Sequence, residues 1–154
     1  MNTRVVALCV IHIACRAAPG PVGPLQRGDR APDLWIELGD RRVSLRGPGQ
    51  AILLDFWDRS CTPCLRAVPE LARLRAHHAA FEIISVTPEE SSAELRAFVA
   101  DHAITWSVAS DSGPVHAAFR VDRYPSYFLI DADGMVVCAP CSLAQVDRLL
   151  GAPR

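Results

Sequence analysis

Two stretches of the chain are apolar almost without interruption, and both predict buried strands. Residues 51–57 read AILLDFW, and residues 81–88 read FEIISVTP. Runs of this kind are typical of central strands that are covered on both faces. Two shorter segments, residues 33–38 and 42–45, flank a Gly-Asp dipeptide and predict a β-hairpin.

Apolar residues at helical spacing follow the first buried strand. Leu65, Val68, Leu71 and Leu74 recur at intervals of three, which predicts a helix that begins near residue 61. Pro69 lies inside this helix and is expected to kink it.

Further elements follow in alternation. A helix over residues 91–103 is expected to open with a capping box formed by Ser91 and Glu94, and a last helix, ending at Leu150, with one formed by Ser142 and Gln145. Between them we expect a strand (105–111), a short helix (113–121) and a hairpin (126–140) that turns at Asp133-Gly134. The order β-β-β-α-β-α-β-α-β-β-α predicts an α/β fold with a mixed central sheet covered on both faces.

The composition is consistent with this fold and excludes some classes of binding partner. The chain has 154 residues, of which 50% are hydrophobic and 21% are charged, so one soluble domain is expected. The net charge of −1 provides no bulk attraction to nucleic acid or to an anionic membrane. We expect a monomer that does not bind nucleic acid.

The N-terminal segment differs from the rest of the chain. Arg4 is followed by an apolar run over residues 5–14 and by a Pro/Gly-rich stretch, a pattern typical of a secretory signal. A buried strand or a misassigned start codon is the alternative. The run is too short for a transmembrane helix. We place the signal at residues 1–18, a linker at 19–27 and a folded domain at 28–151, and expect an extracytoplasmic location in a bacterial periplasm.

Cys15 suggests a second interpretation of the N-terminal segment, as a lipoprotein signal. It follows Ile13 and Ala14, as in a bacterial lipoprotein signal, but His12 stands where that motif has an aliphatic residue. A lipid on Cys15 would be the one route by which the protein is attached to a membrane.

The chain has six cysteines, and four of them form two Cys-x-x-Cys pairs in the predicted domain. The pairs are Cys61 with Cys64 and Cys138 with Cys141. In an exported protein both pairs would lie in an oxidising compartment, where disulfides persist.

Three interpretations of the first pair compete. A structural disulfide that closes so small a loop contributes near the lower end of about 0–5 kcal/mol. A structural zinc site needs four ligands, often from two pairs about 15–20 residues apart, and here the second pair is much further along the chain. A redox pair needs only a helix N-terminus, whose free N–H groups favour a thiolate.

The redox interpretation assigns a role to each cysteine. Cys61, at the helix start, is the nucleophile, and Cys64, one turn inside, is shielded and attacks the mixed disulfide. Pro63 suits the first turn of a helix, where its missing N–H is not needed. No cofactor is required beyond the two thiols.

Asp55 is the one acidic residue inside the first apolar run. It is either a carboxylate that reaches solvent at the strand end, or a buried carboxylate behind the cysteines. In the second case burial raises its pKa, and it can take the proton from Cys64.

The segment AILLDFWDRSCTPC resembles the active-site segment of the thioredoxin superfamily. Asp55, Phe56, Trp57, Cys61, Pro63, Cys64 and Pro69 fall on matching positions. The segment VDRYPSYFLIDADG resembles the second signature of the family, in which Pro125 would be a cis proline. The leading GDRAPDLWIEL segment and the FLIDADG segment are most similar to the exported TlpA-like branch.

This resemblance implies a thioredoxin-like fold with an N-terminal β-hairpin and thiol–disulfide exchange with partner proteins. The catalytic residues would be Cys61, Cys64, Asp55 and Pro125, and an upstream electron donor or acceptor would be a further partner. The groove that receives the partner would be lined by Trp57, Ser60, Thr62, Pro63, Tyr124 and Ser126.

The chain departs from the family pattern beside the cysteines. Ser60 replaces the usual Trp before the first cysteine, so the partner-facing surface is smaller and more polar. Ala67 stands where several cytochrome-maturation reductases of this branch have Glu, which puts that specialised role in doubt. Asp58 and Arg59 add opposite charges beside the site.

The second pair, Cys138 and Cys141, is not a hallmark of the family. It is either a small structural disulfide, two unrelated buried cysteines, or a second redox pair that relays electrons. Two other functions compete with disulfide exchange. A thiol peroxidase would have Thr where Asp58 lies, and a copper-delivery module would need a downstream ligand, for which His116 is the candidate.

Overall fold

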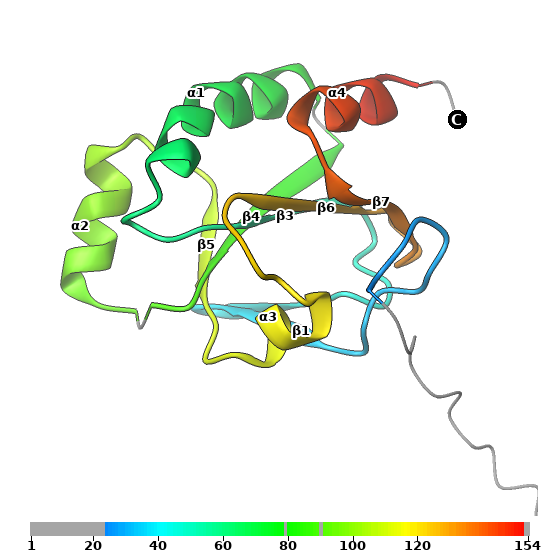
Figure 1. The fold of residues 1–154 in the computed structure, drawn as a ribbon, viewed down its shortest axis with the longest axis horizontal. Coiled ribbons are helices and arrows are strands. Elements are labelled where there is room, and N and C mark those ends of the chain that lie inside the picture. The colour runs from blue at the N-terminus through cyan, green and yellow to red at the C-terminus, as the bar shows by residue number, and fades with distance from the viewer. Residues whose placement is uncertain (1–23, 79, 90, 153–154) are drawn as a thin grey trace, which may run out of the picture.

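A five-stranded mixed sheet forms the centre of the protein (Figure 1). The computed structural model describes residues 24–78, 80–89 and 91–152. The central strand pairs in parallel with one neighbour and antiparallel with the other, which confirms the predicted mixed sheet. The strands are β3 (Ala51–Phe56), β4 (Phe81–Thr87), β5 (Ser107–Ser110), β6 (Ser126–Ile130) and β7 (Val136–Cys141), in the order β5-β4-β3-β6-β7.

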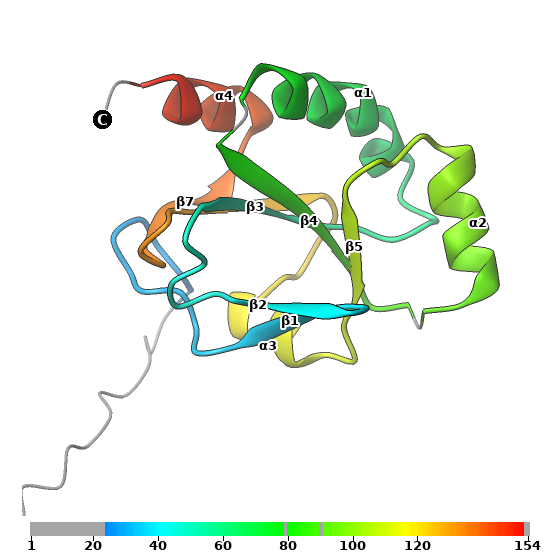
Figure 2. The ribbon, with the colours of Figure 1, turned by 180° about the vertical axis from the view of Figure 1, so that it is seen from behind.

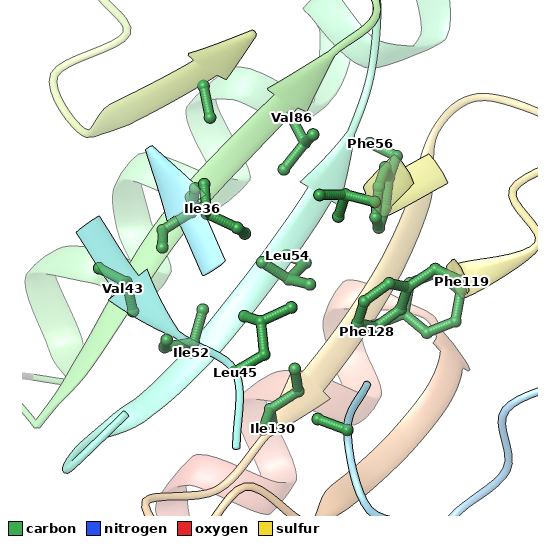
Figure 3. Close-up of a cluster of buried hydrophobic side chains, with 14 of the residues drawn as sticks. Ile36, Val43, Leu45, Ile52, Leu54, Phe56, Val86, Phe119, Phe128 and Ile130 are labelled. Carbon is green, nitrogen blue, oxygen red and sulfur yellow. The ribbon is translucent and has the colours of Figure 1, made fainter. Parts of the chain in front are cut away.

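The predicted N-terminal hairpin covers one face of this sheet. Strands β1 (Trp35–Leu38) and β2 (Arg41–Ser44) pair antiparallel, and they lie on the same side of the sheet as helix α3 (Pro114–Phe119) (Figure 2). Figure 3 shows hairpin side chains such as Ile36 and Val43 pointing toward the aliphatic residues of β3. The hairpin therefore closes a hydrophobic core on this face.

Two helices cover the opposite face. Helices α1 (Thr62–His77) and α4 (Leu143–Gly151) lie side by side above the sheet, and α2 (Ala93–Asp101) stands beside the β5 edge (Figures 1 and 2). Leu71 and Leu74 of α1 are buried in this second core. Pro69 is contained within α1.

Strand β3 serves both cores because successive side chains of a strand point to opposite faces. Ile52 and Leu54 belong to the hairpin-side core, and Leu53 belongs to the core under α1 and α4. All six residues of the strand are buried. This confirms the prediction that the apolar run at residues 51–57 forms a central strand covered on both faces.

The helix starts agree with the predictions at one position and differ at the other. Ser142 and Gln145 form the predicted capping box of α4. Helix α2 is capped by Ser92 instead of Ser91, because the Ser92 hydroxyl accepts the backbone N–H of Leu95 at 3.0 Å. Leu95 is the buried residue of this helix, so its burial sets the register in which Ser92 is the cap.

The folded domain begins before Gly28, where the predicted boundary was placed. Leu25 is only 4% exposed and belongs to the hairpin-side core. The N–H of Gly28 donates to the carbonyl of Val136 at 2.9 Å, which fixes this segment along the edge of β7. The predicted linker at residues 19–27 therefore ends inside the core, and the predicted signal at residues 1–18, with Cys15, lies outside the described residues.

The described residues contain no helix that is both long enough and apolar enough to cross a bilayer.

Gly134 is expected to tolerate no side chain, because its turn packs closely on the chain before β3. Its φ is +81°, and a Cβ at this position would overlap the backbone carbonyl of Arg46. Gly39 has a similar φ of +75°, with no atom near its missing Cβ. Gly39→Ala should lower the free energy of unfolding by about 1 kcal/mol through backbone strain alone, and Gly134→Ala by about 1–3 kcal/mol more. Urea denaturation of both variants checks this, and equal losses would contradict the close approach.

Candidate active site

The pairing of β3 with β6 brings the two signature segments together. Phe56, the last residue of β3, pairs with Ser126, the first residue of β6. The segment that leads to Cys61 and the segment that ends at Pro125 therefore meet the sheet at the same end of these strands. The Tyr124–Pro125 peptide is cis, as the resemblance implies.

Cys61 is the N-cap of α1, which confirms its predicted position. Its sulfur accepts the backbone N–H of Cys64 at 3.1 Å, and its carbonyl accepts the N–H of Leu65 at 3.2 Å. The first turn of α1 contains no acidic residue. Free N–H groups at a helix start stabilise a thiolate, so this geometry favours ionisation of Cys61 in the reduced protein.

The two sulfur atoms of the pair form a disulfide and differ in accessibility. The Cα atoms of Cys61 and Cys64 are 5.3 Å apart. Cys64 is 5% exposed and belongs to the core under α1, whereas Cys61 is half-buried. A partner can therefore reach Cys61 and not Cys64, as the redox interpretation predicts.

The charged residues before Cys61 are held by local contacts. Asp58 accepts hydrogen bonds from the backbone N–H and the hydroxyl of Ser60, at 2.8 and 2.7 Å. Arg59 forms an ion pair with Glu89, from the loop after β4, and its backbone N–H donates to the same carboxylate at 3.0 Å. The Arg59 charge is thus already matched by a carboxylate.

Asp55 is the buried carboxylate of the site, with 5% exposure. It alternates with Ile52 and Leu54 along β3, so it lies on the face of the sheet that α1 covers. Burial raises its pKa to about 6, and a hydrogen bond from Ser85 partly offsets this effect. The alternative in which Asp55 reaches solvent at the strand end is therefore wrong.

Two residues that support Asp55 were not identified from the sequence. The Ser85 hydroxyl donates to Asp55 Oδ2 at 2.6 Å and accepts the indole N–H of Trp106 at 2.8 Å. Ser85 faces Asp55 because β4 pairs with β3 in this register. A polar residue inside the second apolar run was the available signal, since a buried hydroxyl needs partners.

Tyr127 is a third residue that the sequence analysis did not assign. It pairs with Asp55 across β3 and β6, and its hydroxyl is buried without a hydrogen-bond partner among the described residues. Burial raises the pKa of Tyr127, and the nearby carboxylates of Asp55 and Glu70 raise it further. A neutral phenol thus lies beside the Asp55 carboxylate.

Five of the six predicted groove residues lie at the surface of the site. Ser60, Thr62 and Pro63 are exposed. Tyr124 and Ser126 are half-buried. The pKa of Tyr124 is raised, mainly by burial and then by the negative charges of Asp58 and Asp111.

Trp57 was predicted to line the groove, and this is wrong. It is 2% exposed, and its ring stacks on Phe98 of α2, with centroids 6.1 Å apart. Trp57 follows β3 directly and continues its alternation toward α1, so its ring enters the core. Trp57 therefore belongs to the core under α1 and does not line the groove.

His116, the candidate ligand of the copper-delivery alternative, is engaged with a carboxylate. Its Nδ1 lies 2.6 Å from Asp111 Oδ2, and its ring packs edge-on against Phe56 and Tyr124. Within residues 24–78, 80–89 and 91–152, no group of three His, Cys, Asp or Glu side chains is arranged to hold a metal ion.

The second cysteine pair forms a disulfide near the end of β7. The Cα atoms of Cys138 and Cys141 are 5.6 Å apart. Two unrelated buried cysteines are therefore excluded, and the structural and redox interpretations of this pair remain.

A sheet of this order, a Cys-x-x-Cys pair at the start of α1 and a cis proline at the start of β6 together define a thioredoxin-like protein. The sequence model of the AhpC/TSA family matches residues 27–139. The thioredoxin-like protein YneN of Bacillus subtilis (strain 168) is 28% identical over 118 residues, which are 73% of this chain and 69% of that protein. The thiol-disulfide oxidoreductase ResA of Bacillus thuringiensis (strain Al Hakam) is 30% identical over 118 residues, which are 73% of this chain and 68% of that protein.

A solved structure of a related protein indicates the same class of protein. A putative thiol:disulfide interchange protein DsbE from Chlorobium tepidum superposes with a TM-score of 0.67 and 26% identity, over 81% of this chain and 93% of that chain. The chain belongs to the AhpC/TSA family and, within the thioredoxin superfamily, to its TlpA-like branch. It is a thiol–disulfide oxidoreductase.

Replacing Asp55 by Asn should stabilise the oxidised protein at neutral pH. The Asp55 pKa rises from 3.8 in the unfolded chain to about 6 in the folded protein, so the folded protein binds this proton more tightly. Its contribution to stability therefore falls as the pH rises from about 4 to about 6, by about 3 kcal/mol. We expect Asp55→Asn to raise the free energy of unfolding at pH 7 by about 1–3 kcal/mol, with a gain that disappears near pH 4.

Urea denaturation of both oxidised proteins at several pH values measures this difference. Subtracting the two curves removes the common effect of carboxylates whose pKa is lowered, such as Asp111. A variant that is less stable than the natural protein by the same amount at every pH would contradict the raised pKa.

Proposed function

We propose that the protein exchanges disulfides with partner proteins outside the cytoplasm, with Cys61 as the nucleophile and Cys64 as the resolving cysteine. The observation that carries this proposal is the asymmetry of the pair. The reachable sulfur of Cys61 caps α1, and the second sulfur lies in the core beneath it.

The proposed exchange has two steps in the reducing direction. The Cys61 thiolate attacks one sulfur of a partner disulfide, which forms a mixed disulfide and releases one partner thiolate. The Cys64 thiolate then attacks the sulfur of Cys61 and releases the second partner thiolate. The Cys61–Cys64 disulfide remains, and an upstream dithiol must reduce it before the next cycle.

Asp55 is proposed to accept the proton of Cys64 in the second step. The Cys64 thiol is buried, so its proton does not exchange freely with solvent. Asp55 lies in the same core, and with a pKa of about 6 it is mostly ionised at neutral pH while still basic enough to hold a proton. A base whose pKa lies near the working pH is the most effective.

The partner backbone is proposed to lie between the loop before Cys61 and the cis peptide at Pro125. Tyr124, which precedes Pro125 in this peptide, and Ser126, which follows Pro125, are half-buried and so can contact a partner there. Ser60 and Thr62 would line the other wall. The signal-like residues 1–18 support an exported location, with a lipid anchor on Cys15 as an alternative form of attachment, and the protein would act as a monomer.

Replacing each cysteine of the first pair should produce a different defect. In a chain whose Cys138 and Cys141 are replaced by Ser, Cys61→Ser removes the nucleophile, so insulin reduction with dithiothreitol should fall to the uncatalysed rate. Cys64→Ser keeps the nucleophile but removes the resolving thiol, so a stable mixed disulfide between Cys61 and insulin should accumulate. Non-reducing gels and mass spectrometry detect the adduct. Adduct formation by Cys61→Ser, or full activity of either variant, would refute the assigned roles.

The rate should depend on pH through Asp55. Because its carboxylate must be ionised to accept the proton, single-turnover insulin reduction should increase as the pH rises through about 6. Asp55→Asn should lower this rate by about 100-fold, at the lower end of general-base contributions, and abolish the transition. Ser85→Ala removes the hydrogen bond that lowers the Asp55 pKa, so the midpoint should move to a higher pH.

The Ser85→Ala variant keeps the Asp55 carboxylate and changes its pKa, so a shifted midpoint reports proton transfer and not a loss of folded protein. A midpoint unchanged in this variant, or a transition that persists in Asp55→Asn, would assign the pH dependence to another group. Peroxide consumption at the rate of insulin reduction would favour the thiol peroxidase alternative.

A further inference from the structure

A bulge in β7 brings the second cysteine pair together. Leu129 of β6 pairs with Cys138, and Tyr127 pairs with Cys141, so two residues of β7 lie opposite the single residue between Tyr127 and Leu129. Residues three apart in a regular strand are separated by about 10 Å, whereas the Cα atoms of this pair are 5.6 Å apart. Bulges of this kind redirect side chains and often lie next to active sites.

The two cysteines line separate cavities. Cys141 lines a cavity of about 470 Å³ to which Pro125 and Ser126 also contribute. Cys138 lines a second cavity, of about 460 Å³, together with residues of α4 such as Gln145. Cys141 is therefore approached from the same side as the cis proline of the proposed partner groove.

The pair is asymmetric in the same sense as Cys61 and Cys64. Cys138 is 8% exposed and lies in the core under α1 and α4, whereas Cys141 is half-buried. Cys141 directly precedes Ser142, the N-cap of the nine-residue helix α4, whose first turn has no acidic residue. Cys141 is thus the more exposed cysteine and lies beside a helix start, and Cys138 is the less exposed one.

We propose that Cys138 and Cys141 form a second site of thiol–disulfide exchange, which reacts with a cysteine-containing segment of a partner protein lying in the cavity beside Pro125. The proposal concerns sulfur atoms other than Cys61 and Cys64 and does not depend on the function proposed for that pair.

The exchange starts from the disulfide that the structure contains. A thiolate of a partner dithiol attacks Sγ of Cys141, the Cys138–Cys141 bond breaks, and Cys138 leaves as a thiolate. The second partner thiolate attacks the partner sulfur of this mixed disulfide, and Cys141 leaves as a thiolate. The partner is oxidised to a disulfide, two electrons reduce the Cys138–Cys141 pair, and the two protons of the partner thiols pass to the new thiolates or to solvent.

The first experiment uses the full chain with Cys9, Cys15, Cys61 and Cys64 replaced by Ser, so that only the second pair remains. The protein is incubated with dithiothreitol, quenched with acid and labelled with a maleimide for mass spectrometry. We expect two thiols to appear together while far-UV circular dichroism stays that of the folded protein. Thiols that appear only after unfolding in urea would show a purely structural disulfide and overturn the proposal.

The second experiment adds either Cys138→Ser or Cys141→Ser to this background, as a matched pair. The probe is a cysteine peptide activated as its thionitrobenzoate disulfide, and the rate of thionitrobenzoate release is measured at pH 7. The variant that keeps Cys141 should form the peptide adduct about tenfold faster than the variant that keeps Cys138. Equal rates, or faster reaction at Cys138, would overturn the assignment of Cys141 as the attacked sulfur.

A third measurement needs no substitution and remains decisive if these variants do not fold. The natural protein is titrated with dithiothreitol, alkylated, and digested to locate the labelled cysteines. Reduction of Cys138 and Cys141 in the folded chain supports the site, and a pair that stays oxidised in excess reductant while Cys61 and Cys64 are reduced refutes it. Because insulin reduction tests the first pair separately, either proposal can fail without the other.

Discussion

The antiparallel pairing of Phe56 with Ser126 is the contact on which the arrangement of the site depends. It places the end of β3 beside the start of β6, so the loop to Cys61 and the cis peptide at Pro125 lie at one end of the sheet. A slip of one residue in this pairing would send alternate side chains to the opposite faces. Asp55 would then lose its place in the core that contains Cys64. The pairing is held because both faces of β3 are buried, and a shifted register would disrupt two hydrophobic cores at once.

The same pairing forces a carboxylate into an apolar environment. Asp55 receives one neutral hydrogen bond, from Ser85, and no ion pair with it is found among the described residues. A cationic neighbour would have stabilised the fold but would have lowered the pKa of Asp55. A neutral donor leaves this pKa at about 6, within range of a working base. The stability lost at neutral pH and the capacity to accept a proton therefore have one physical cause, the burial of the charge.

Local patterns in the sequence were sufficient for the elements and for the cysteine at the start of α1. The unbroken apolar run of β3 predicted a strand buried on both faces, and the spacing of Leu71 and Leu74 predicted the helix. Contacts between segments that are far apart in the sequence could not be predicted from such local patterns. Ser85 supports Asp55 only through the register of β4 on β3, and Leu25 is buried only because the N-terminal segment pairs with the edge of β7. The inward turn of Trp57 likewise depends on Phe98 of α2.

The two cysteine pairs have the same spacing in the sequence but lie in backbone of different conformation. The spacing alone therefore does not determine whether two cysteines meet. At the start of α1, the N-cap position of Cys61 and the first helical turn bring its sulfur to that of Cys64. In β7 the same spacing would separate the cysteines, and the bulge beside Tyr127 brings them together. Tyr127 pairs with Asp55 on one side and with Cys141 on the other, so the three side chains form a row on the face that α1 and α4 cover.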